Sequence, residues 1–212
     1  AEHFQFSVLV ITIDGPINGL RNREQRTEFS LPPNVRAVNI DTPPPLAHPG
    51  EGKSVVFQGL MAQAPIWEDI AFIQQHTSLP IVLKGILNPL DAQKAAELGV
   101  AGIVVSNHGG RALDSVPSPV EMLPIIRQTV GDEMMVLADS GVRRGADVVK
   151  LMALGANAVL IGRPLMYGLA TAGALGVAHT IRLLRDELEM TMALCGVGSI
   201  EEINKHCLWP TA

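Results

Sequence analysis

Short apolar runs alternate with segments of helical periodicity along most of the chain. The apolar runs are rich in Val, Ile, Leu and Ala, as in strands that are buried on both faces. Between them, apolar residues recur every three or four positions, as on one face of a helix. The predicted strands are Phe6–Ile13, Leu79–Lys84, Ala101–Ser106, Met134–Ala138 and Ala158–Ile161. The predicted helices are Trp67–His76, Pro89–Leu98, Pro119–Val130, Ala146–Leu154 and Ala178–Leu194.

Strand and helix alternate with short connections, which is typical of parallel βαβ units and predicts an α/β fold. A weak internal repeat supports this, because 96–106 and 153–162 both run from a helix end through Leu-Gly into a strand. One stretch breaks the pattern. From Glu28 to Pro65 the sequence has many prolines and glycines and no periodicity. We expect either a lid or an insertion without fixed structure there.

Composition narrows the class of protein. The chain has 212 residues, enough for one domain with a core, and only 4% are aromatic. The formal charge of −5 argues against a nucleic-acid surface, and the arginines stand singly or in pairs beside glycines, which suits small anions.

Targeting and redox signals are weak. Cys195 and Cys207 have neither metal-ligand spacing nor a disulfide framework, so we expect no metal site and a reducing, cytoplasmic setting. No apolar run is long enough for a membrane span. The first residues lack the pattern of a signal peptide, and the last three are not a peroxisomal signal.

Polar candidates follow each predicted strand. In a parallel barrel the carboxyl ends of the strands meet on one face, so these side chains would converge there. Any single one of them could instead be a solvated loop residue. The candidates are Thr12, Asp14, Lys84, Ser106, His108, Arg111, Asp139, Arg143, Gly162 and Arg163.

The segment Ser106–Arg111, with sequence Ser-Asn-His-Gly-Gly-Arg, is the richest in chemistry. His108 can take a proton near neutral pH, and Arg111 can hold a carboxylate through two parallel hydrogen bonds. Lys84 ends a very apolar strand. Its ammonium group either reaches along the strand to solvent or faces a ligand that becomes negative.

Glycines and arginines after the last two strands predict a phosphate site. Such sites are common after the final strands of α/β barrels, where backbone N–H groups approach the anion. The alternative is a pair of helix starts with surface arginines. The residues concerned are Gly141, Arg143, Gly145, Gly162 and Arg163.

Four motifs together resemble the FMN-dependent 2-hydroxy-acid oxidases and dehydrogenases, a family that includes glycolate oxidase, lactate oxidase and mandelate dehydrogenase. They are Leu83–Leu87, Ser106–Arg111 with Leu113 and Asp114, Asp139–Gly145, and Gly162–Pro164. Their order and spacing agree from about Phe6 to Leu194. The resemblance implies oxidation of a small (S)-2-hydroxy acid to the 2-oxo acid with FMN as electron acceptor, followed by oxygen or another acceptor.

The resemblance also implies catalytic and substrate-binding roles. His108 would be the base, and Asp14 would accept a hydrogen bond from its imidazole. Arg111 and Arg21 would hold the substrate carboxylate. Lys84 would stand beside the flavin and stabilise its anionic reduced ring.

The cofactor roles follow in the same way. Thr12 and Ser106 would hydrogen-bond the flavin, and Asp139 would bind the ribityl hydroxyls. The FMN phosphate would be held by the glycines and arginines after the last two strands, namely Gly141, Arg143, Gly162 and Arg163.

Two features depart from the family pattern. Ser140 stands where many members have glycine; mandelate dehydrogenases look similar here, which favours an aromatic hydroxy acid. Members also carry three further strands and two active-site tyrosines upstream, and the single tyrosine here, Tyr167, matches neither.

The resemblance therefore implies an eight-stranded TIM barrel of which this chain supplies strands four to eight and the C-terminal helices. Residues 1–212 would be the C-terminal part of one FMN-binding domain, with about 24–65 as a mobile active-site loop. The expected partners are the missing N-terminal half of the barrel and further copies in a homotetramer. Two alternatives stay open: another FMN- or phosphate-binding barrel enzyme, and a non-catalytic half barrel.

Overall fold

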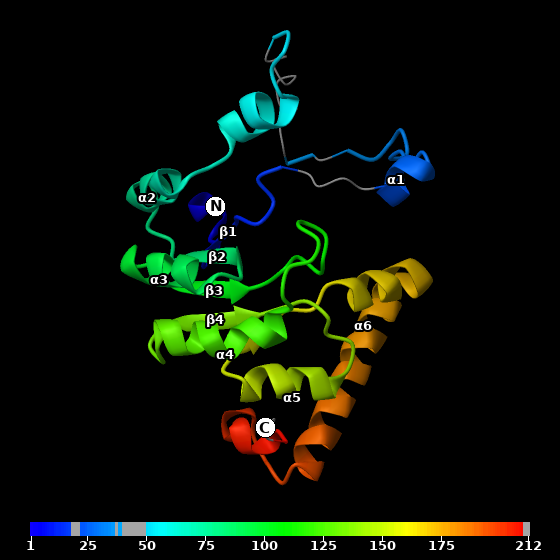
Figure 1. Ribbon diagram of the computed structural model, residues 1–212. Helices are drawn as coiled ribbons and strands as arrows, with labels where there is room; N and C mark the ends of the chain where they lie inside the picture. Colours follow the sequence, from blue (N-terminus) through cyan, green and yellow to red (C-terminus); the bar gives the residue numbers. More distant parts are fainter. Residues whose placement is uncertain (18–21, 37, 40–49, 210–212) are drawn as a thin grey trace.

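The computed structural model describes residues 1–17, 22–36, 38–39 and 50–209. Within them, five parallel strands form one sheet in the order β1-β2-β3-β4-β5, so each strand lies beside the next one along the chain (Figure 1). This confirms the predicted parallel α/β fold. The strands are β1 (Leu9–Thr12), β2 (Ile81–Ile86), β3 (Gly102–Val105), β4 (Met135–Ala138) and β5 (Ala158–Val159).

Helices occupy the connections between the strands. Helices α3, α4 and α5 each join two neighbouring strands, and α6 runs beside α5 after the last strand (Figure 1). The chain then folds back against α5 in short 3-10 turns at Ile200–Glu202 and Lys205–Cys207. The helices are α1 (Asn22–Arg26), α2 (Trp67–Gln75), α3 (Pro89–Glu97), α4 (Pro119–Val130), α5 (Gly145–Ala153) and α6 (Arg163–Leu194).

The helices begin where local chemistry favours a start. Asn88 Oδ1 accepts a hydrogen bond from the Leu90 N–H at 2.9 Å, and Pro89 occupies the first turn of α3, where a missing N–H costs nothing. In α4, the Glu121 carboxylate reaches back to the Ser118 N–H at 2.8 Å, which completes a capping box. These caps fix where each helix leaves the loop that follows a strand.

One face of the sheet carries the core. Side chains such as Leu83, Ile103 and Val136 are fully buried, and they belong to the same apolar cluster as residues of the covering helices. The first strand is less covered: Val10 is 49% exposed. Among the described residues, β1 and β5 each pair on one side only. The sheet is therefore open at both edges, which agrees with the expectation that this chain supplies five of the eight strands of a barrel.

Three details differ from the sequence-based expectations. Lys84 does not end its strand, because β2 continues to Ile86 through an irregular register at Gly85. The stretch expected to lack structure contains a π-helical turn at Val55–Leu60 and a 3-10 turn at Met61–Gln63. The last helix begins at Arg163 rather than Ala178 and is broken at Ala172 and Gly173, whose backbone angles are not helical. Within the described ranges, no helix combines the length and the apolar character that a membrane span requires.

Candidate active site

Chemically active side chains gather where the strands end. Lys84 Nζ lies 3.1 Å from Asp139 Oδ2 and donates a hydrogen bond to Ser106 Oγ, also at 3.1 Å. The side chains of Lys84 and Asp139 are 18% and 15% exposed. Lys84 therefore does not extend along the strand to solvent. Its ammonium group is held inside the site, which decides between the two orientations that the sequence allowed.

A second pair lies at the end of β1. His108 Nδ1 is 3.0 Å from Asp14 Oδ1, and the Asp14 side chain is only 10% exposed. An ionised carboxylate only accepts hydrogen bonds, so Nδ1 carries the hydrogen and Nε2 is left to accept a proton. The other oxygen, Asp14 Oδ2, is buried and has no hydrogen-bond partner among the described residues. The imidazole is thus the main group that can balance this carboxylate.

The turn that carries His108 has an unusual backbone. His108, Gly109 and Gly110 have φ angles of 56°, 66° and 74°, three left-handed residues in succession. Non-glycine residues seldom adopt this conformation, although histidine does so more often than most. Ser106 Oγ holds the turn by accepting the His108 N–H at 3.0 Å. Ser106 is fully buried, so it acts as an internal anchor.

Gly85 makes room for the His108–Asp14 pair. Its φ is 110°, and a Cβ placed on it would lie 2.5 Å from both Cβ and Cγ of Asp14. Sequence reasoning placed Gly85 in a motif but gave it no role. The available signal was a lone glycine within a strand, which often marks a close approach of another group.

A cavity of about 260 Å³ connects these groups. Four cationic side chains and the imidazole line it, namely Lys84, Arg111, Arg143, Arg163 and His108. Added Cβ atoms at Gly141 and Gly162 would meet nothing within 4 Å, so the backbone there is open to a ligand. The cavity thus has a cationic wall suited to an anion, while the phosphate site itself stays a prediction from the sequence.

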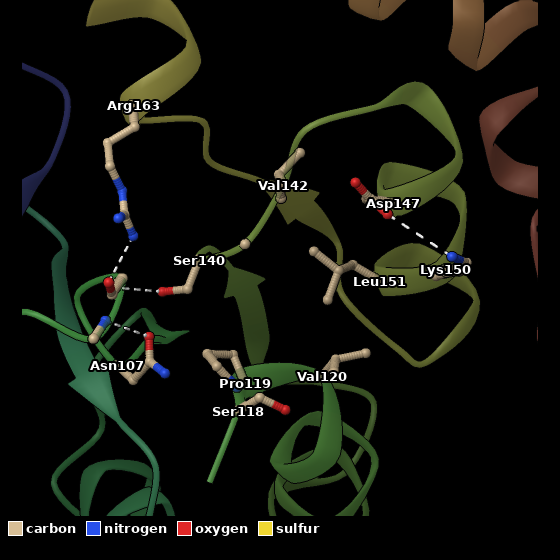
Figure 2. A pocket seen from close by; sticks show the side chains of 13 residues that line it. Asn107, Ser118, Pro119, Val120, Ser140, Val142, Asp147, Lys150, Leu151 and Arg163 are labelled. Carbon is tan, nitrogen blue, oxygen red and sulfur yellow. Dashed lines mark hydrogen bonds and ion pairs between the residues drawn. The ribbon is translucent and has the colours of Figure 1, made fainter. Parts of the chain in front are cut away.

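Figure 2 shows a neighbouring cavity of about 450 Å³, between the loops after β3 and β4. Gly109, Ser140 and Arg163 line both cavities. Arg163 Nη2 donates to the Gly109 carbonyl at 2.6 Å, and the Gly109 N–H donates to Ser140 Oγ at 3.0 Å. These contacts join residues that line both cavities.

The structure brings most of the predicted residues together. Thr12 is the last residue of β1 and is paired in register with Lys84. Arg21, expected to hold the substrate carboxylate, lies outside the described residues. In the described part of the chain, no group of three or more His, Cys, Asp or Glu side chains is placed to hold a metal ion.

A family model described as FMN-dependent dehydrogenase matches residues 1–210. The chain belongs to this family. The resemblance seen in the four sequence motifs is thereby confirmed over nearly the whole chain.

Several relatives carry names that fit the family. The chain is 48% identical over 202 residues to an L-lactate oxidase of Roseobacter sp., covering 94% of this chain and 55% of that protein. It is 40% identical over 211 residues to 2-hydroxyacid oxidase 1 of Homo sapiens, covering 97% and 57%. A crystal structure of mandelate oxidase with (S)-2-phenylpropionate matches with a TM-score of 0.83 and 41% identity, covering 96% of this chain and 55% of that one. The chain therefore spans about half the length of the relatives it matches.

The residues present fit the cofactor of this family. FMN carries a phosphate, a polyol chain and a ring that becomes anionic on reduction. The cavity offers arginines beside open glycine backbone, the carboxylate of Asp139 and the ammonium group of Lys84. These donor and acceptor types complement the three parts of FMN.

Proposed function

We propose that the whole protein oxidises a small (S)-2-hydroxy acid to the 2-oxo acid with FMN as the immediate electron acceptor. The observation that carries this proposal is the pair formed by His108 and Asp14, whose Nδ1 and Oδ1 atoms lie 3.0 Å apart. His108 and Arg111 line the same cavity. A base beside a carboxylate-binding group is what removal of a proton from a hydroxy acid requires. The names of the relatives support the same substrate class.

In this proposal His108 Nε2 takes a proton from the substrate, at carbon or at the hydroxyl. Asp14 orients the ring through Nδ1 and stabilises the imidazolium that forms. Among the described residues Asp14 Oδ2 has no partner, so this stabilisation depends on the placement of the one hydrogen bond between Asp14 and His108. Arg111 binds the substrate carboxylate, and Arg21 is the proposed second clamp.

FMN, when bound, supplies the acceptor for the two electrons that leave the substrate. Around it, Lys84 would balance negative charge, while Thr12 and Ser106 would hydrogen-bond the ring system. Asp139 would accept hydrogen bonds from the polyol chain. The phosphate would be bound by Gly141, Arg143, Gly162 and Arg163.

The whole protein would supply the remaining strands of the barrel. We propose that further strands pair with the open edge of β1, where Val10 is exposed, and close the barrel. Residues 24–65 would then act as a loop over the site. A homotetrameric assembly and a cytoplasmic location stay predictions from the sequence.

The direct test is anaerobic reduction of the bound flavin. The FMN-loaded whole protein is mixed in parallel with L-lactate, glycolate and (S)-mandelate, and loss of the yellow absorbance is followed. Bleaching by at least one acid is expected, and the rates rank the side chains that the pocket accepts. If none of the three bleaches the flavin, the proposed activity is wrong.

A companion experiment addresses the rest of the barrel. The 212-residue chain alone is mixed with FMN and the same acids. We expect weak FMN binding and no turnover, because part of the cavity wall would be missing. A monomeric, yellow and fully active chain would contradict this part of the proposal.

A further inference from the structure

We infer that Ser140 is a positioning residue that locks the base His108 and the Lys84–Asp139 pair into one unit. This inference rests on the proposed function. It assigns Ser140 a role distinct from the substrate preference that the sequence suggested.

The starting point is the hydroxyl group of Ser140. It donates to Asp139 Oδ1 at 2.7 Å and accepts the Gly109 N–H at 3.0 Å. Its single hydrogen and one of its lone pairs are therefore used within the protein. The group ties the loop after β4 to the turn after β3, and Figure 2 shows it reaching across between them.

These two bonds close a circuit of polar contacts. Asp139 is paired with Lys84, Lys84 donates to Ser106 Oγ, and Ser106 Oγ accepts the His108 N–H. From His108 the chain leads to Gly109 and, through its N–H, back to Ser140. Without the Ser140 hydroxyl the circuit would be open between Gly109 and Asp139. Of the circuit's contacts, those through Ser106 would then be the ones that still join the base to the Lys84–Asp139 pair.

Backbone strain indicates that this arrangement is maintained by its surroundings. Ser140 has a φ of 72°, a conformation that favours glycine. A residue held in this region persists when neighbouring contacts determine it. Glycine at 140 would relieve the strain, but it would remove both hydrogen bonds. The serine thus keeps the bridge at the expense of an unfavourable backbone angle.

The turn that Ser140 holds is itself composed of left-handed residues, so it needs external support. Arg163 binds the Gly109 carbonyl while Ser140 binds the Gly109 N–H. The Gly109 peptide groups are therefore clamped from two sides. Because His108 precedes Gly109, a shift of this turn moves the imidazole relative to Asp14.

Two substitutions separate the bridge from the strain. Ser140→Ala loses the hydroxyl and keeps an unfavourable φ, whereas Ser140→Gly loses the hydroxyl and relieves the angle. Ser115 provides a matched control, because it is also a serine with a positive φ of 62°, and its side chain is exposed and lies outside both cavities. Ser115→Ala and Ser115→Gly reproduce the backbone effects without touching the bridge.

The first measurement does not depend on activity. Hydrogen exchange of the Gly109 amide is followed in the FMN-free whole protein. We expect exchange about tenfold faster or more in both Ser140 variants and unchanged exchange in both Ser115 variants. If the Gly109 amide of Ser140→Gly exchanged as slowly as in the unsubstituted protein, the Ser140 hydroxyl would not be what holds the Gly109 turn.

The second measurement is the rate of anaerobic flavin reduction at saturating substrate. A shift of the base should slow this rate about tenfold or more in both Ser140 variants, with the KM for the hydroxy acid changed less than the rate. Ser140→Gly should do so without a loss of thermal stability, which a merely structural role would not predict. Normal reduction by Ser140→Gly, even with fast Gly109 exchange, would refute the positioning role. If the unsubstituted protein bleaches with no acid, the proposed function fails, while the exchange result still decides on the bridge.

Discussion

At the amino ends of the strands, Arg127 donates to the carbonyls of Gly155, Gly131 and Met134, each at 2.8 Å, and to Asn157 Oδ1 at 2.6 Å. At the carboxyl ends, Asp14 has one hydrogen bond and one buried oxygen without a described partner. Both ends contain charged, partly buried groups. Arg127 is held by three backbone carbonyls and an amide oxygen, whereas Asp14 has the His108 imidazole as its one partner among the described residues.

The carboxyl ends also carry strained backbone next to the reactive groups. His108 and Ser140 adopt left-handed angles at the carboxyl ends, although neither is glycine. At the amino ends, Glu2 is bound by Thr77 Oγ1 and by the N–H and Oγ of Ser78, at 2.7 to 3.0 Å. Unsatisfied and strained groups tend to collect where a protein does chemistry, and satisfied networks where it holds its shape. The comparison therefore predicts that substitutions at the two ends affect different measurements.

The largest effect should come from His108→Ala. Removal of the proposed base should slow anaerobic flavin reduction about a thousandfold or more in the FMN-loaded whole protein. FMN affinity should change little, whereas the unfolding midpoint should fall, because the largely buried Asp14 carboxylate loses the imidazole that balances it. His76→Ala is the control, because His76 lies at the end of α2, before β2, and its ring nitrogen contacts the Phe72 carbonyl rather than a carboxylate. Near-normal reduction by His108→Ala would remove the base assignment.

Gly85→Ala should give the next largest effect. The new Cβ would collide with Asp14, so Asp14 must move away from His108. The alanine would also have to adopt a φ of 110°, which is unfavourable for any residue with a side chain. We expect flavin reduction about a hundredfold slower and a loss of about 1–3 kcal/mol in the free energy of unfolding. Gly131→Ala is the matched control, since Gly131 has a positive φ of 73° but open space around it. If both variants reduced the flavin equally well, the close approach at Gly85 would have no catalytic meaning.

Gly85 also shows the limit of prediction from sequence. Apolar runs and periodicity located all five strands and the parallel order, because these depend on local pattern and short connections. The same rule placed Lys84, His108 and Asp139 at one edge. It could not show that Gly85 faces Asp14, because that contact joins residues distant in sequence.

Ser140 was noticed only as a departure from the family pattern. Its hydroxyl partner, the Gly109 N–H, lies 31 positions away, so the bridge depends on how two loops meet. The start of α6 was missed for a different reason. The glycines and alanines near its break at Ala172 and Gly173 weaken helical periodicity, and the helix there is shaped by tertiary contact. Local pattern thus predicts elements, while loop-to-loop contacts must be observed.

Arg127→Ala tests the opposite end. It removes a guanidinium that joins the loops before β4 and β5, and burial lowers the pKa of this group without removing its charge. We expect a loss of about 2–4 kcal/mol in the free energy of unfolding, measured by urea denaturation, because three carbonyls and an amide oxygen lose a donor. At urea concentrations well below the unfolding midpoint, the rate of flavin reduction should stay within twofold of that of the unsubstituted protein. Arg182→Ala, from an exposed ion pair on α6, should cost under about 0.5 kcal/mol. A rate loss in Arg127→Ala as large as that in Gly85→Ala would abolish the division between the two ends.

Glu2→Gln should give the smallest effect, and it should depend on pH. The Ser78 N–H, together with the hydroxyls of Thr77 and Ser78, lowers the pKa of the Glu2 carboxyl in the folded protein. A carboxyl whose folded pKa is depressed stabilises the protein above its unfolded pKa, and that contribution is lost as the pH falls through the folded value. The unfolding midpoint of Glu2→Gln should therefore lie slightly below that of the unsubstituted protein at pH 7, and the two should converge as the pH falls through the lowered pKa of the folded protein. Glu133→Gln, which removes an exposed carboxylate in the loop before β4, is the matched control for the loss of one negative charge. If the difference in unfolding midpoint between Glu2→Gln and the unsubstituted protein widened on acidification, the prediction would be wrong. The ionised carboxylate would then not be the group that holds the first residues to the segment before β2.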